Sequence, residues 1–153
     1  MKQQTSEPKK VQISEQQKKK GCQNKSEAVR TIQQQQIYRT VENLYATLLQ
    51  MKKICPVKYR GNLNSLYTIC AHTFTALSVA YDDETVRVFS LNEVVAQMVA
   101  LLSMLRYLHG EGTMSNDDYR KAKSLAQSCL QQARAWRAST VVRFSQGSGE
   151  TTN

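Results

Sequence analysis

Apolar residues recur every three or four positions in four long stretches of this chain, and this spacing most constrains its fold. Such a repeat places apolar side chains on one face of an α-helix. The first predicted helix runs from near residue 26 to about residue 54, and its face consists of Ile37, Val41, Leu44, Leu48 and Met51. It ends before Pro56, because a residue that precedes proline avoids helical backbone.

Three further helices follow the same rule. The second, over residues 62–81, carries Leu63, Leu66, Cys70, Phe74 and Leu77. The third, over residues 85–108, has one face made of Val88, Leu91, Val95, Met98, Leu102 and Leu105. Beside that face lie Val94, Val99, Leu101 and Leu108, so most of this helix's circumference is apolar and more than one of its sides should be covered.

The fourth helix opens at Ser115-Asn116-Asp117-Asp118, a sequence resembling a capping box. Its apolar face is Tyr119, Ala122, Leu125 or Ala126, Cys129, Ala133 and Trp136. Four helices of about 20 residues with short connections favour an all-α, antiparallel up-down-up-down four-helix bundle. The bundle is expected over residues 26–140. A disordered Lys/Gln-rich tail should precede it over residues 1–25, and a frayed C-terminal tail should follow over residues 141–153.

The net charge of +9 favours polyanionic partners. Residues 1–30 hold eight Lys or Arg and three Glu, so much of the excess lies in the tail. Lys18-Lys19-Lys20 in that tail is typical of a nucleic-acid-binding patch, or of an ordinary solvated segment. The N-terminus has no apolar signal region and no stretch suggests a membrane span, so the sequence predicts a cytoplasmic protein.

No catalytic or metal-binding pattern is recognisable, so we predict a protein that is not an enzyme and uses no cofactor. His72 and His109 lack the Glu three residues earlier that a di-iron bundle requires. The four cysteines have no zinc-site spacing and are expected to be reduced thiols. Asp82-Asp83-Glu84 fits a helix start better than a cation site. No small-molecule substrate is expected.

A basic cluster is the best candidate site in the chain. Lys52, Lys53, Lys58 and Arg60 surround the predicted connection between the first two helices, and Tyr59 among them could stack on an unpaired base. In an antiparallel bundle the end of the third helix, which carries Arg106, approaches the same region. The competing interpretation is that these residues are ordinary solubilising charges.

The chain also resembles a known family over about residues 30–140. The resembling segments are Met104 to Gly110, Met114-Ser115 at the start of the last helix, Arg134-Ala135-Trp136-Arg137 near its end, and Leu44-Tyr45 with the Pro56-to-Gly61 loop. These segments are similar to the accessory variability determinant (Avd) of diversity-generating retroelements. The basic tail has no counterpart in that family.

The resemblance implies a homopentameric four-helix bundle that binds a reverse transcriptase and a structured template RNA, and possibly the cDNA made from it. It implies nucleic-acid contacts from the third helix, where Arg106 matches one basic position. Leu102 stands where an earlier basic residue would be expected, so the match of this surface is partial. Arg134 and Arg137 are weaker contact candidates. Two alternatives stay open: a bundle protein of the type encoded in 23S ribosomal RNA intervening sequences, and a purely structural helical oligomer.

Removal of residues 1–25 tests the predicted tail. Because this segment offers no apolar core, the truncated protein should melt at nearly the same temperature as the full chain. Its non-specific RNA affinity should fall, because cations that neutralise phosphates have been removed. Circular dichroism melts and fluorescence anisotropy with RNA measure the two effects. A loss of several degrees would show that the tail is packed.

Overall fold

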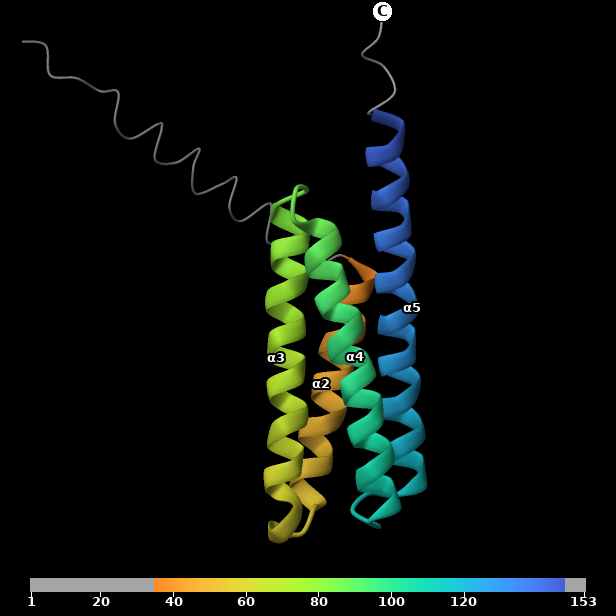
Figure 1. Cartoon of the computed structure of the whole chain (residues 1–153). Helices are drawn as coiled ribbons and strands as arrows, with labels where there is room; N and C mark the ends of the chain where they lie inside the picture. Colours follow the sequence, from red (N-terminus) through yellow and green to blue (C-terminus); the bar gives the residue numbers. More distant parts are fainter. Residues whose placement is uncertain (1–34, 148–153) are drawn as a thin grey trace, which may run out of the picture. The chain divides into compact units, whose positions relative to one another are not determined.

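The computed structural model describes residues 35–147, and four long helices occupy most of them (Figure 1). The elements are α2 (Gln36–Ile54), the short 3-10 helix η1 (Val57–Tyr59), α3 (Arg60–Asp82), α4 (Arg87–Gly110) and α5 (Asn116–Gly147). Residues 35–147 contain no strand, which confirms the all-helical prediction for this part of the chain. The predicted tail, residues 1–25, lies outside the described residues.

The helices pack around one apolar core. α2 contacts α3 and α5, and α4 also contacts α3 and α5. Each helix contributes one stripe of buried side chains. The five residues predicted for the first helix face are all buried in α2. On α3, Leu63, Leu66, Cys70 and Leu77 are buried as predicted, whereas Phe74 is half-buried and its ring lies 5.0 Å from that of Tyr38.

Helix α4 presents to the core a stripe that only partly matches the prediction: Leu91, Met98 and Leu105 are buried as expected, whereas Val94, Leu101 and Leu108 take the place of Val88, Val95 and Leu102. Its fully buried large side chains are Leu91, Val94, Met98, Leu101, Leu105 and Leu108. Val88, Val95 and Leu102 from the predicted face are only half-buried. Both stripes repeat every seven residues, so the spacing alone could not select between them. By length and composition α4 could also cross a membrane, a test that buried core helices pass as well.

Two helix ends differ from the prediction. α2 begins at Gln36, because Gln35 has extended backbone (φ −63°, ψ 129°). Residues 26–34 of the predicted first helix lie outside the described residues. α5 continues to Gly147, past the predicted end near residue 140. No Gly or Pro interrupts residues 116–146, so the helix persists beyond Thr140, its last buried residue.

The α4–α5 turn follows the predicted chemistry. Gly112 has φ +70°, a left-handed conformation that favours glycine. The Ser115 hydroxyl accepts a hydrogen bond from the Asp118 N–H (3.1 Å) and donates one to its carboxylate (2.8 Å). Ser115 therefore caps the start of α5, and the Asp118 carboxylate meets its hydroxyl instead of the backbone N–H that completes a capping box. His109 stacks on Tyr119 with ring centroids 4.2 Å apart. The imidazole thereby joins the end of α4 to the start of α5.

Arg87 links three helices at the opposite turn. Its Nε donates a hydrogen bond to the Ala80 carbonyl of α3 (2.7 Å), and its guanidinium pairs with Glu84 (2.9 Å). The same guanidinium lies 5.8 Å from the centroid of the Trp136 ring on α5. Because this side chain is only 15% exposed, its hydrogen bonds are partly shielded from water.

Arg87→Ala should therefore destabilise the protein. The change leaves the Ala80 carbonyl without its arginine donor and removes the contact with Trp136, so we expect a loss of about 1–3 kcal/mol in the free energy of unfolding. Urea denaturation measures it. Arg120→Ala is the matched control, since Arg120 reaches Asp117 only at 4.0 Å and both side chains are exposed. Equal stability losses in the two variants would contradict the linking role.

Three cysteines, Cys55, Cys70 and Cys129, are buried and free. Burial raises the pKa of the Cys70 thiol to about 12. Burial also raises the pKa of the Cys129 thiol to about 12, with a smaller contribution from Cys70. Since the thiolate is the nucleophilic form, both thiols are chemically quiet in the folded protein. They belong to the core and not to a reactive site.

Alkylation followed by peptide mass spectrometry tests this assignment. At pH 8, Cys70 and Cys129 should stay unmodified in the native protein and be modified in guanidinium chloride. Both thiols ionise near pH 9 when exposed but only near 12 when folded. Unfolding therefore releases protons in this range, and stability should fall as the pH rises through it. Rapid native labelling of either thiol at pH 8 would contradict the burial.

Candidate nucleic-acid interface

One end of the molecule brings together the α2–α3 connection and the α4–α5 turn (Figure 1). A cavity of about 310 Å³ lies between them, with walls from Met51, Ile54 and Cys55 on one side and Gly112 to Ser115 with Asp118 on the other. The Tyr67 hydroxyl of α3 donates a hydrogen bond to the Leu48 carbonyl of α2 (2.8 Å). These contacts fix the positions of the surrounding cations, and we call this region the basic end.

Lys52 and Lys53 lie in the last turn of α2, where positive charge interacts favourably with the helix dipole. The Lys52 side chain already interacts with residues of α3. Its Nζ donates a hydrogen bond to Asn64 Oδ1 (3.3 Å) and lies 5.4 Å from the Tyr67 ring centroid. Lys53 is exposed. Lys53 is therefore the better placed of the two for a phosphate.

Lys58 and Tyr59 interact with each other in η1. The Lys58 Nζ lies 4.6 Å from the Tyr59 ring centroid, and a hydrogen bond with the Tyr59 side chain raises the pKa of Lys58. The lysine is therefore charged at neutral pH. Tyr59 is half-buried and packs against the core. One face of this ring is thus occupied, which reduces the area open to a stacking base.

Arg60 occupies an electrostatically unfavourable position. It is the first residue of α3, where the helix dipole favours negative charge. The first turn of α3 holds no acidic residue, and Arg60 is exposed and makes no ion pair with any residue in the described range. A cation here slightly destabilises the helix, so stability does not explain its presence.

Arg106 lies near the end of α4, at the same end of the molecule (Figure 1). It is exposed, as is its neighbour Tyr107. In the alternative interpretation, Arg106 caps the last carbonyls of α4. Within residues 35–147 the Arg106 guanidinium makes no hydrogen bond. The α4 carbonyls of Tyr107, Leu108 and His109 instead accept hydrogen bonds from the following turn. The described contacts therefore do not support the capping alternative.

Arg134 and Arg137 are not brought together with this cluster. They lie about 18 to 21 residues from the start of α5, roughly 30 Å along the helix. Arg137 is half-buried and donates a hydrogen bond to Asn92 Oδ1 of α4 (2.7 Å). Arg137 is thus a structural link between α5 and α4. Arg134 is exposed but remote from the other predicted cations.

Sequence analysis missed three cations of the basic end. Arg120, Lys121 and Lys123 occupy the first turns of α5. Lys121 lines a shallow groove of about 480 Å³ that α2 also lines through Asn43 and Gln50. The basic end then carries eight Lys or Arg against three acidic residues: Lys52, Lys53, Lys58, Arg60, Arg106, Arg120, Lys121 and Lys123, against Glu111, Asp117 and Asp118.

The remaining polar candidates have structural explanations. The Asp83 carboxylate accepts hydrogen bonds from the Thr85 N–H (2.9 Å) and hydroxyl (2.6 Å), which lower its pKa. Glu84 pairs with Arg87. Over residues 35–147, no three His, Cys, Asp or Glu side chains are grouped so that they could hold a metal ion.

Comparisons with protein-family models, with curated proteins and with solved structures found no match to this chain.

Proposed function

We propose that this protein is a non-catalytic accessory protein that binds structured RNA through its basic end. The four helices form an antiparallel up-down-up-down bundle in this proposal. Short connections and the pairing of α2 and α4 each with α3 and α5 support that topology. The bundle serves as a scaffold that holds cations in fixed positions against phosphate groups.

The position of Arg60 at the start of α3 is the observation that best supports the proposal. A cation at the start of α3 opposes the helix dipole and has no acidic partner in the first turn. Seven more cations share this end with only three acidic residues. Their combined potential attracts a polyanion. The groove beside Lys121 also carries the amides of Asn43 and Gln50, which can donate hydrogen bonds to a sugar-phosphate backbone without regard to sequence.

The resemblance to accessory variability determinant proteins extends the proposal to a biological role. In that role the protein holds a reverse transcriptase and its template RNA together during mutagenic cDNA synthesis, and assembles as a homopentamer. A reverse transcriptase gene beside the gene for this chain, together with a pair of near-identical repeats, would support the role. A ribosomal RNA gene around it would favour the intervening-sequence alternative.

Substitution of single cations tests RNA binding. Anisotropy with a labelled hairpin RNA, measured between about 50 and 300 mM salt, gives the slope of log affinity against log salt. Loss of one phosphate contact should reduce the magnitude of that slope by roughly 0.7–0.9. We expect this for Arg106→Ala, Arg60→Ala and Lys121→Ala, with unchanged helicity and melting.

Arg134→Ala is the matched control, because Arg134 is also exposed but remote from the basic end. Its affinity and salt slope should equal those of the unsubstituted protein. Arg137→Ala should lower the melting temperature, because it loses the bond to Asn92, and should leave the slope unchanged. Equal slopes for all these variants would refute the proposed surface. Lower melting for Arg106→Ala with intact RNA affinity would make Arg106 a structural cap.

A further inference from the structure

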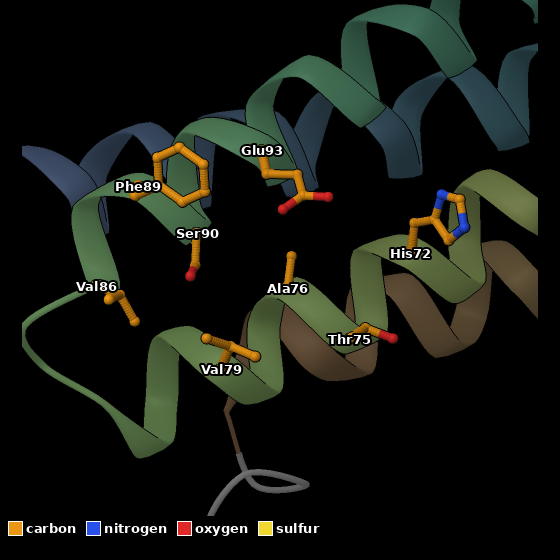
Figure 2. Close-up of a pocket in the computed structure, with 8 residues that line it drawn as sticks. All are labelled: His72, Thr75, Ala76, Val79, Val86, Phe89, Ser90 and Glu93. Carbon is orange, nitrogen blue, oxygen red and sulfur yellow. The ribbon is translucent and has the colours of Figure 1, made fainter.

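An exposed groove lies between α3 and α4 (Figure 2). It extends to the α3–α4 turn, which lies at the end of the molecule opposite the basic end (Figure 1). Its volume is about 430 Å³. The α3 wall includes Ala76 and Val79, and the α4 wall includes Phe89 and Glu93. The Phe89 side chain is 74% exposed. So large an exposed fraction is unusual for a phenylalanine. The groove thus offers apolar surface with the Glu93 carboxylate and the His72 imidazole beside it.

Apart from the charged α3–α4 turn, which holds Asp82 to Glu84 and Arg87, the two helices beside this groove carry few charges. Between Arg60 and Asp82, α3 carries no Lys, Arg, Asp or Glu, and between Arg87 and Gly110, α4 carries only Glu93 and Arg106. Small side chains such as Ala96, Ala100 and Ser103 continue the exposed face of α4. A neighbouring helix could therefore approach closely without burying unpaired charges.

The end of α5 has the complementary character. Residues 141–146 are all exposed, and Figure 1 shows this part of α5 extending past the α3–α4 turn. Val141 and Val142 are 47% and 53% exposed, and Arg143 lies directly after them. Residues 134–147 include three arginines and no acidic residue. This segment matches the groove in both apolarity and charge.

We propose that the groove between α3 and α4 receives the projecting end of α5 from a second copy of this chain. Val142 of that copy would cover Phe89 and Val79, and its Arg143, the next residue around the helix, would approach the Glu93 carboxylate at the edge of the groove. Within residues 35–147, Glu93 has no ion-pair partner of its own. Because the end of α5 projects beyond its own bundle, it reaches the groove of a neighbouring molecule more readily than the α3–α4 groove of its own bundle.

This inference deepens the self-association within the proposed function and does not depend on RNA binding. A charge swap on the full-length protein tests it, with light scattering after size exclusion and no RNA present. The unsubstituted protein should show at least twice the 17.4 kDa mass of one chain. Glu93→Arg and Arg143→Glu should each weaken association by about tenfold, because each opposes like charges. The double variant should restore it.

Matched variants separate this contact from general effects of charge and apolarity. Glu42→Arg on α2 and Arg120→Glu at the other end of α5 change exposed residues outside the groove and should leave the mass unchanged. Phe89→Ser should give single chains, whereas Tyr107→Ser, on the same helix but outside the groove, should not. Circular dichroism should show equal helicity throughout.

Three outcomes would overturn the inference. The first is a single-chain mass for the unsubstituted protein at tens of micromolar, which would leave the groove to a different protein or to residues 1–34 of the same chain. The second is an unchanged mass for both single charge variants. The third is a double variant no more associated than either single one. Loss of RNA binding with the mass pattern intact would refute only the proposed function.

Discussion

The structure depends on the burial of α4 on two sides, against α3 and against α5. Six large side chains of α4 are fully buried, from Leu91 to Leu108. At about 1.5–3 kcal/mol for each side chain, this burial is a major apolar contribution from a single helix. α5 meets it with small residues, Ala122, Ala126, Cys129 and Ala133. Small side chains on one helix opposite large ones on another allow close packing without voids.

Charged residues are distributed unevenly over this bundle. The exposed positions of α3 and α4 hold mostly small, apolar or uncharged polar residues. The Lys, Arg, Asp and Glu residues lie mostly at the helix ends, on α2 and on α5. The basic end and the nearly uncharged face of α3 and α4 are therefore separate surfaces of the same bundle. Arg87 strengthens this core from outside, because its guanidinium joins the α3–α4 turn to Trp136 of α5.

Sequence periodicity predicted the helices well but not which of two stripes would face the core. On α2 only one apolar face exists, and all its predicted members are buried. On α4 the stripe through Val95 and Leu102 is as apolar as the one through Val94 and Leu101. The choice between them depends on where α3 and α5 lie, which local spacing does not contain. Leu125 and Ala126 posed the same problem on α5, and the close approach of α5 to its neighbours selected the smaller residue.

The basic cluster could be predicted only where it was local in sequence. Lys52 to Arg60 lie within nine residues, so their proximity follows from the short connection. Lys121 stands about 60 residues later and is placed near Gln50 by the contact between α2 and α5. A prediction limited to sequence neighbours had no means of finding it. Arg134 and Arg137 lie about 30 Å from the start of α5, a separation from the basic end that their charge alone could not reveal.

The two proposed surfaces are far enough apart to work independently. Arg60 and Val79 stand 19 residues apart on α3, which corresponds to about 28 Å along the helix axis. The Debye length at physiological ionic strength is about 8 Å, so phosphates bound at the basic end are electrostatically screened from the groove. Association of chains through α5 would therefore neither compete with RNA nor require it. It would instead repeat the basic end in each copy, and several linked phosphate-binding surfaces hold one RNA more tightly than a single surface does.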